Sequence, residues 1–331
     1  MPSNSRDTYP RLVGDIGGTN ARFATIVGPD RSLGTVRTLP CADFAGPREA
    51  IEHYLAITGM PRPHWCAFGI ANPVEGDRVH MTNHEWAFSI RALREALGLE
   101  RLEVVNDFTA LAMALPVLRA ADLMRVGGGD PLARRAIGLV GPGTGLGVSG
   151  LVPCGDDYAA IEGEGGHVTL AASDAHEAAL IAWFATRFDH VSAERVLSGP
   201  GLVALYEAHA AVAGQAPERL SSADISARAL AGDAPLCVAT ANSFCAFLGT
   251  VAANLALELG ARGGIYIGGG IVPRLGDFFA RSPFRARFEH KGRFGAYLAR
   301  IPTYVIQAPN PALLGAARIL ARRAGTPSSA P

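Results

Sequence analysis

A glycine turn with a carboxylate beside it stands near the start of the sequence, in the stretch LVGDIGGTNARFA at residues 12–24. The apolar run predicts a strand, and Gly17, Gly18 and Thr19 can offer backbone N–H groups to a phosphate. The stretch is neither a G-x-G-x-x-G turn nor a P-loop, which carries a lysine after its glycines. Asp15 would repel phosphate but could bind the Mg²⁺ that accompanies ATP. The alternative is that Asp15 only bonds the turn that follows it.

The same pattern of strand and glycine turn occurs twice more. AIGLVGPGTGLGVSGLV at residues 136–152 places Gly143, Thr144 and Gly145 in a second turn between two strands, and GGIYIGGGIVPRL carries a third turn after a strand at residues 264–267. Repetition of one unit predicts two similar domains. We expect the first two turns to face each other across a cleft that holds a polyphosphate.

A second carboxylate stands where a strand should end and a helix begin, in the segment VVNDF. Asp107 could project into a cleft from there and accept a hydroxyl proton during phosphoryl transfer. The helix N-terminus would favour its ionised form. The alternative is that Asn106 or Asp107 only caps the helix.

Two further segments carry groups suited to a sugar. GEGGHV supplies Glu164 and His167 in a turn that its glycines permit, and SAERVLSG supplies Glu194. Carboxylates and imidazoles can bond several hydroxyl groups of an uncharged ligand. The alternatives are a surface Glu164, a core His167, and a Glu194 that pairs with Arg195 or Arg187.

Composition narrows the kind of partner. A chain of 331 residues that is 49% hydrophobic can bury a large core and favours two domains. Thirty basic residues balance thirty acidic ones without a basic run, which argues against nucleic acid and membrane surfaces as partners. The five scattered cysteines lack a C-x-x-C pair and fit free thiols in a reducing cytosol, and the N-terminus has no export signal. We expect a cytoplasmic protein with small-molecule partners.

Strands rich in Val, Ile and Leu alternate with helical patterns, which is typical of an α/β fold with a largely parallel sheet. The expected strands and helices of the first half are strands at 12–13, 23–27, 67–70 and 103–105, and helices at 47–57, 90–97 and 108–114. The uncharged stretch 234–257 is long enough to span a bilayer. Its polar residues and its apparent caps, Asp233 with Pro235 in front and Gly260 behind, favour a buried core helix instead.

The chain should divide near residue 117. We expect a small α/β domain at 9–117, completed by a C-terminal helix at 310–323, and a large α/β domain at 118–309. Asn310 and Pro311 predict the cap and first position of that helix. The tail AGTPSSAP at 324–331 is expected to be disordered.

Seven motifs, in this order, resemble those of the bacterial glucokinase family in the superfamily of hexokinase, heat-shock chaperones and actin: GDIGGTNARFA, MTNHEWAFSI, VVNDFTALA, GPGTGLGV, GEGGHV, HVSAERVLSGPGL and GGIYIGGGIVPR. The resemblance runs from about residue 11 to about residue 322. It implies a two-domain actin-like ATPase (ribonuclease H-like) fold with the active site in the interdomain cleft. The activity that it implies is ATP-dependent phosphorylation of glucose at the 6-hydroxyl.

The resemblance also implies roles for individual residues. Asp107 would be the catalytic base, and the glucose ligands would be Asn106, Asp107, Glu164, His167 and Glu194. The residues around the three turns would bind ATP: Gly14, Asp15, Ile16, Gly17, Gly18, Thr19, Asn20, Gly143, Thr144, Gly145, Gly268, Gly269 and Gly270. Asp15 would hold the Mg²⁺ of ATP, directly or through water, and a homodimer is common in such enzymes.

Departures from related proteins limit the alternatives. The zinc-binding cysteine and histidine cluster of the ROK sugar kinases is missing near His167, which predicts no structural zinc. Only about ten residues precede the first hairpin, too few for the helix-turn-helix of the repressors in that group. A kinase for mannose or fructose stays open, as do ADP or polyphosphate as donors. So does a non-enzymatic nucleotide-binding protein of the actin or chaperone type, which would not need the sugar-binding residues.

Overall fold

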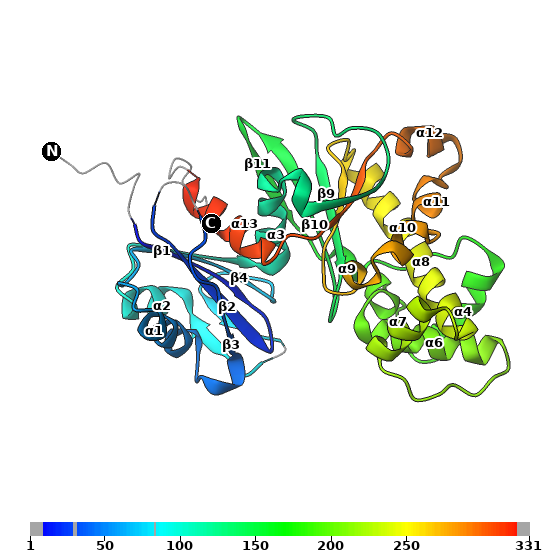
Figure 1. Ribbon diagram of the computed structural model, residues 1–331, viewed down its shortest axis with the longest axis horizontal. Coiled ribbons are helices and arrows are strands. Elements are labelled where there is room, and N and C mark those ends of the chain that lie inside the picture. Colours follow the sequence, from blue (N-terminus) through cyan, green and yellow to red (C-terminus); the bar gives the residue numbers. More distant parts are fainter. Residues whose placement is uncertain (1–8, 29–31, 83, 323–331) are drawn as a thin grey trace. The chain divides into compact units, whose positions relative to one another are not determined.

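The computed structural model describes residues 9–28, 32–82 and 84–322. These residues form two compact units (Figure 1). Unit 1 holds the described residues up to Leu118 together with those from Pro309 onward, and unit 2 is Arg119–Ala308. The predicted disordered tail at 324–331, and Arg323 at the expected end of the last helix, lie outside the described residues.

Unit 1 is built on a five-stranded sheet in the order β3-β2-β1-β4-β7. The strands are β1 (Arg11–Ile16), β2 (Asn20–Ile26), β3 (Arg37–Pro40), β4 (Trp65–Ile70) and β7 (Arg101–Asn106). β1, β2 and β3 pair antiparallel, whereas β4 and β7 continue the sheet parallel to β1. The carboxyl ends of β1, β4 and β7 therefore meet at one edge.

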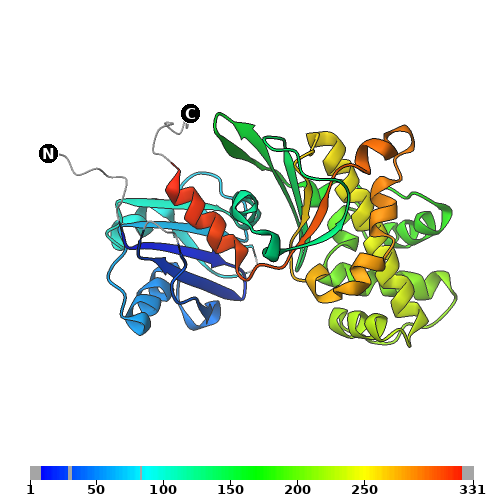
Figure 2. The ribbon, with the colours of Figure 1, turned by 45° about the horizontal axis from the view of Figure 1, so that its top comes forward.

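Helices cover both faces of this sheet. They are α1 (Pro47–Thr58), α2 (Ile90–Ala96), α3 (Asp107–Ala114) and α13 (Pro311–Ala321), and a small ribbon joins β5 (Arg78–His80) to β6 (Ala87–Ser89). Leu12 of β1 shares a buried cluster with Tyr54 of α1, while its neighbour Val13 shares another with Leu313 of α13. This alternation is what a strand requires. The C-terminal helix, red in Figure 2, thus packs on the sheet formed by the start of the chain.

The start of α13 agrees only in part with the prediction. Pro311 is its first residue, as predicted, but Asn310 makes no side-chain cap bond and lies in the left-handed region at φ 50°. Asparagine is among the few residues that accept this conformation, so Asn310 supplies the change in chain direction and not a hydrogen-bond acceptor.

Unit 2 repeats the order of unit 1 in a six-stranded sheet, β11-β10-β9-β12-β13-β8. The strands are β8 (Leu123–Gly127), β9 (Ile137–Pro142), β10 (Leu146–Cys154), β11 (Asp157–Glu162), β12 (Ile265–Ile267) and β13 (Thr303–Ile306). Both sheets begin with three antiparallel strands and add two parallel ones, so the repeat predicted from the glycine turns is confirmed. The prediction of a largely parallel sheet was wrong. A turn of only three residues, as after β1 and β9, can join only antiparallel neighbours.

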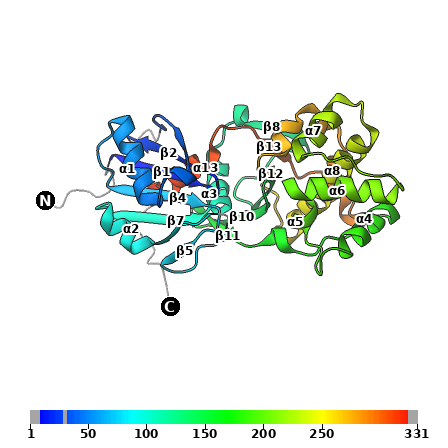
Figure 3. The ribbon, with the colours of Figure 1, turned by 90° about the horizontal axis from the view of Figure 1, so that it is seen from below.

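The uncharged stretch forms α8 (Pro235–Leu259) in the interior of unit 2. Around it lie the helices α4 (Ala175–Ala185), α5 (Ala193–Val196), α6 (Gly199–Val212), α7 (Ser222–Ala231), α9 (Val272–Leu275), α10 (Asp277–Arg281), α11 (Phe284–Glu289) and α12 (Gly295–Leu298). Figure 3 shows α6 and α7 beside it. Within the described part of the chain, α8 is the one helix long and apolar enough to cross a membrane, and 72% of its most apolar window is buried.

The prediction that this stretch is a buried core helix is confirmed, with one correction at its start. The N-cap residue is Ala234, without a side-chain cap bond, so Asp233 does not cap the helix. Gly260 ends the helix in the left-handed conformation at φ 59°, as a C-terminal glycine should.

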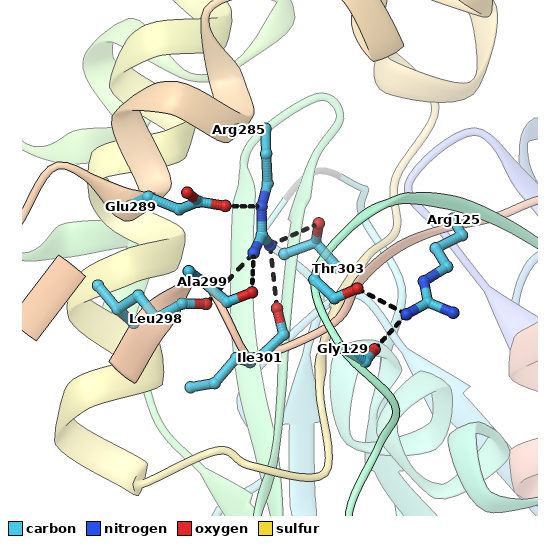
Figure 4. Close-up of polar contacts among 9 residues, drawn as sticks. Arg125, Gly129, Arg285, Glu289, Leu298, Ala299, Ile301 and Thr303 are labelled. Atoms are coloured by element: carbon cyan, nitrogen blue, oxygen red, sulfur yellow. Dashed lines mark hydrogen bonds and ion pairs between the residues drawn. The ribbon is translucent and has the colours of Figure 1, made fainter. Parts of the chain in front are cut away.

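Arg285 on α11 fixes the segment that leads into β13 (Figure 4). Its guanidinium donates at 2.9–3.2 Å to four oxygens, those of Leu298, Ala299, Ile301 and Thr303. Its Nε pairs with Glu289 at 2.6 Å. Nearby, Arg125 on β8 binds the carbonyls of Gly128 and Gly129. These bonds satisfy the carbonyls that follow α12 and hold β13 in the sheet.

Candidate functional site

In unit 1, the predicted residues gather at the edge where three parallel strands end. Ile16 of β1 lies beside Ile70 of β4, and Ile70 lies beside Asn106 of β7. The N–H of Ala71 donates to the carbonyl of Ile16 at 3.0 Å and ties the ends of β1 and β4 together. The first glycine turn, after β1, and Asp107, after β7, therefore occupy the same edge, as expected for a binding site on parallel strands.

The first glycine turn is braced from within and from outside. The N–H of Gly17 donates to the carbonyl of Asn20 at 2.9 Å, so this N–H is used within the turn. Cys41 donates its N–H to the carbonyl of Thr19 at 2.9 Å and its thiol to that of Gly17 at 3.4 Å. The N–H groups of Gly18 and Thr19 donate to no backbone carbonyl of the described residues and are the donors left for an anion.

Two of the predicted nucleotide residues serve packing. A Cβ on Gly14 would lie 2.8 Å from the ring of Phe68 and 3.0 Å from that of Phe23, so the glycine lets the two aromatic rings close over β1. The side chain of Ile16 is fully buried in the core beneath the turn. The buried side chain of Ile16 therefore does not reach a ligand, and both residues contribute to the turn through their backbones.

Asp15 forms an ion pair that the sequence analysis missed. Its Oδ2 lies 3.2 Å from Nη1 of Arg22, which is its direct partner across β1 and β2. Burial raises the pKa of Asp15, and the charge of Arg22 opposes that rise. Counting outward from the three-residue turn would have found the pair, because opposite residues of a hairpin are fixed by its register.

The residues at the start of α3 divide the predicted roles between them. Oδ1 of Asn106 accepts the N–H groups of Phe108 at 2.8 Å and Thr109 at 3.3 Å, so Asn106 is the helix cap, as the alternative predicted. Asp107 is the first helical residue, and its Oδ1 also accepts the N–H of Phe108 at 2.8 Å. The half-buried carboxylate of Asp107 is thus held at the helix N-terminus but is not required as its cap.

Asn72 is a polar residue at this edge that the sequence analysis did not single out. Its Oδ1 accepts the N–H and the hydroxyl of Thr82 at 3.0 and 2.6 Å, and its own carbonyl accepts Nδ2 of Asn106 at 3.4 Å. The signal for it was its position two residues beyond β4, since polar residues after parallel strands gather at one edge.

In unit 2, the second and third glycine turns lie side by side. Gly269, at φ 76°, approaches the end of β9 so closely that a Cβ would lie 2.2 Å from the carbonyl of Pro142. The N–H of Gly143 donates to the carbonyl of Gly145 at 2.8 Å and, like that of Gly17, is used within its turn. The carbonyl of Gly143 accepts the N–H of Gly199 at 2.8 Å, which brings the start of α6 to the turn.

The start of α6 adds a positive pole to these turns. The helix has 14 residues, and its cap Ser198 accepts the N–H of Gly201 at 3.0 Å. Helix N-termini of this kind attract anions. The signal in the sequence was the run LSGPGL, in which a serine cap and a proline in the first turn predict a helix start.

Glu194 lies directly against the second turn. Its Oε2 accepts the N–H of Leu146 at 2.8 Å, and a Cβ on Gly145 would lie 2.4 Å from the same oxygen. The alternative that Glu194 pairs with an arginine was wrong. Arg195 and Arg187 instead lie over aromatic rings, those of Phe188 and Trp183, at 4.3 and 3.5 Å from the ring centres.

The loop of Glu164 and His167 packs on the start of β10. A Cβ on Gly166 would lie 2.0 Å from the carbonyl of Leu146, so only glycine permits this approach. Oε2 of Glu164 lies 4.0 Å from Nε2 of His167, and the two side chains are 63% and 60% exposed. His167 is therefore not a core histidine, whereas Glu164 does lie at the surface of the unit, as its alternative predicted.

The chain after this loop joins it to Glu194. The N–H of Ala193 donates to the carbonyl of Val168 at 2.9 Å, and the N–H of Leu170 donates to that of Val191 at 3.0 Å. These antiparallel bonds place Glu194, which follows Ala193, beside His167, which precedes Val168. Unit 2 thus brings three predicted sugar ligands, Glu164, His167 and Glu194, to the second glycine turn.

Known proteins resemble this chain along nearly all of its length. The family profile for glucokinase matches residues 12–323. A glucokinase of Aromatoleum aromaticum is 62% identical over 321 residues, which are 97% of each chain. A crystal structure of glucokinase from an Antarctic psychrotroph is 39% identical with a TM-score of 0.86, over 94% of this chain and 98% of that one. A ROK family glucokinase from Streptomyces griseus, in complex with glucose and AMPPNP, shares the fold at 19% identity with a TM-score of 0.64, over 94% and 99% of the two chains.

Proposed function

Because the chain belongs to the glucokinase family, we propose that it transfers the γ-phosphoryl group of ATP to the 6-hydroxyl of glucose. The observation that carries the proposal is the group of Glu164, His167 and Glu194 against the second glycine turn. A carboxylate accepts hydrogen bonds from hydroxyl groups on both oxygens, and a histidine can donate or accept them. A nucleotide-binding protein of the actin or chaperone type would have no use for such a group.

Asp107 is proposed as the base. The glucose 6-hydroxyl donates to its carboxylate, and the proton passes to Asp107 as O6 bonds to the γ-phosphorus and the bond to the ADP oxygen breaks. The N–H of Phe108 holds the carboxylate in place through its bond at 2.8 Å. Oδ1 of Asn106 accepts the N–H of Phe108, and one hydrogen of its Nδ2 is donated to the carbonyl of Asn72. We propose that the second hydrogen of Nδ2 is donated to a hydroxyl group of glucose.

The phosphates of ATP would lie against backbone donors of both units. In unit 1 these are the N–H groups of Gly18 and Thr19, and in unit 2 they are those of Thr144, Gly145, Gly269 and Gly270, with the start of α6 beside them. The N–H of Gly268 instead donates to the carbonyl of Val140 at 2.9 Å. The proposed base belongs to unit 1 and the proposed sugar ligands belong to unit 2, so the proposed reaction needs groups from both units.

Asp15 is suited to bind the Mg²⁺ of ATP because its side chain offers carboxylate oxygens. Hard carboxylate oxygens bind this ion, which is usually shared with substrate phosphates and so needs only one or two protein carboxylates. Among the described residues, no three His, Cys, Asp or Glu side chains converge as a metal-binding group. Asp15 would therefore hold Mg²⁺ with the phosphates, whose charge the ion neutralises when bound. Arg22, which pairs with Asp15 at 3.2 Å, would then be able to face a phosphate oxygen.

Asp15→Asn is expected to raise the Mg²⁺ concentration needed for half-maximal activity severalfold, because an amide is a weaker ligand for a hard cation. The fold should persist, since Asn can still accept from Arg22. Titration of Mg²⁺ at fixed ATP measures the effect. Asp233→Asn is the matched control, because that exposed aspartate caps no helix. An unchanged Mg²⁺ titration in Asp15→Asn would remove this residue from the metal site.

The function itself is tested by measuring sugar phosphate formation, with ADP release measured in parallel, for glucose, mannose and fructose with ATP or polyphosphate as donor. We expect the highest kcat/KM with glucose and ATP. A higher value with mannose or fructose would reassign the sugar, and activity with polyphosphate but not ATP would reassign the donor. ATP hydrolysis that does not respond to any sugar would favour the non-enzymatic or chaperone-type alternative.

A further inference from the structure

A cavity of about 200 Å³ lies within unit 2, between α8, the β10–β11 hairpin and the loop that carries Glu164 and His167. Its walls are mainly apolar and include Val148, Ile161, Val251, Leu255 and Leu259. The loop contributes Gly163, Gly165 and the residues from Val168 onward, whereas the side chains of Glu164 and His167 do not line the cavity. The cavity is thus separate from the proposed sugar ligands but shares their loop.

One side of the cavity is polar. Thr250, Asn254 and Glu258 recur every fourth residue of α8 and so form one stripe along the helix. Two of them have hydrogen-bond partners from α11 or just after it. Lys291 donates to Oδ1 of Asn254 at 2.6 Å, and Arg287 lies 3.5 Å from the hydroxyl of Thr250.

Glu258 differs from the other two members of the stripe. It is exposed, and its carboxylate has no hydrogen bond or ion pair with any described residue. Among the described residues that line the cavity, it is also the one with a charged side chain. The ammonium of Lys291 is held one helical turn away, at Asn254, so the negative charge belongs to the Glu258 end of the stripe.

We propose that this cavity is a second binding site, which takes a small organic cation with one apolar ring and a short ammonium arm. An apolar cavity of about 150 Å³ is known to hold benzene, so this volume suits a ring with a short substituent. The ring packs on Val148, Ile161 and Leu255, and the ammonium group faces Glu258. A protonated arylalkylamine satisfies both walls, whereas a sugar would leave its hydroxyl groups against apolar side chains.

Occupancy of the cavity is coupled to glucose through the shared loop. A Cβ on Gly165 would lie 2.8 Å from Val148, so the loop rests directly on a side chain that lines the cavity. A ligand that packs against Val148 and Gly163 holds Glu164 and His167 in place and favours glucose binding. This coupling rests on the proposed function, whereas binding of the cation does not. By linkage, glucose must favour the cation by the same factor.

The test uses 2-phenylethylammonium as the probe and the full chain as the sample. Binding is measured by calorimetry without glucose, with 2-phenylethanol as the uncharged analogue and ethylammonium as the ringless one. We expect the probe to bind most tightly, and Glu258→Gln to weaken its binding about 1.4- to fivefold, the usual range for a solvent-exposed charge pair. Glu95→Gln, an exposed glutamate on α2, should not change the affinity.

A second titration measures glucose with and without saturating probe, and we expect about fivefold tighter glucose binding with it. Glucose phosphorylation by Glu258→Gln without probe should match that of the wild type. Absence of probe binding, or equal binding by Glu258→Gln, would overturn the site. Probe binding that leaves glucose affinity unchanged would overturn the coupling alone. Failure to bind glucose in either titration would instead count against the proposed function.

Discussion

Asp107→Asn is expected to lower turnover by about two to four orders of magnitude, which is the usual contribution of a general base. The amide keeps a hydrogen bond to the 6-hydroxyl but cannot take its proton. Glucose affinity should therefore change far less than turnover. Steady-state kinetics and calorimetry of glucose binding, on the same preparation, separate the two quantities.

The structure makes this substitution a clean one. Asn106 already caps α3 through the N–H groups of Phe108 and Thr109, so the helix start does not depend on the charge of Asp107. An amide oxygen at position 107 can still accept the N–H of Phe108, which Oδ1 now accepts at 2.8 Å. A loss of turnover would not be explained by a frayed helix.

Asp277→Asn is the matched control, because Asp277 is also the first residue of a helix, α10, and lies outside both groups of predicted ligands. It should leave turnover unchanged. If Asp107→Asn also retained turnover near that of the wild type, Asp107 would be only a helix-terminal residue and the proposed mechanism would lose its base.

The sequence predicted the elements that depend on local patterns. Glycine turns between apolar runs predicted the hairpins of both units, and the uncharged stretch around Phe244 predicted the core helix α8. These predictions succeeded because a turn and an amphipathic or apolar run are decided by residues close in the chain. The prediction of largely parallel sheets was wrong because it did not take the short turns into account. Each of these turns joins an antiparallel pair of strands.

Contacts between distant residues were beyond such patterns. Nothing around Gly145 indicates that Glu194 would lie against it, 49 positions later, and that contact depends on how the segment after Leu170 returns to β10. The bond between Asn72 and Asn106 likewise needs β4 and β7 to be neighbours in register. A glycine motif also does not reveal which of its N–H groups are used within the turn, as those of Gly17 and Gly143 are.

Glu194→Gln is expected to weaken glucose binding by about tenfold to 150-fold, because hydrogen bonds to a charged group contribute roughly 1.5–3 kcal/mol. Oε2 now accepts the N–H of Leu146 at 2.8 Å, and the amide oxygen of Gln can keep that bond. The other oxygen becomes an NH₂ group, which cannot accept from a sugar hydroxyl. The loss should therefore fall on the sugar and not on the fold.

ATP affinity and thermal stability should barely change in Glu194→Gln, since the backbone of the second glycine turn stays in place. Glu207→Gln, on α6 and away from the turn, provides the control for removing one negative charge from unit 2. Calorimetry with glucose and with ATP measures both affinities. Equal glucose affinity in the two variants would mean that Glu194 serves only to hold Leu146, whereas a parallel loss of ATP affinity would mean that its charge shapes the phosphate-binding turn.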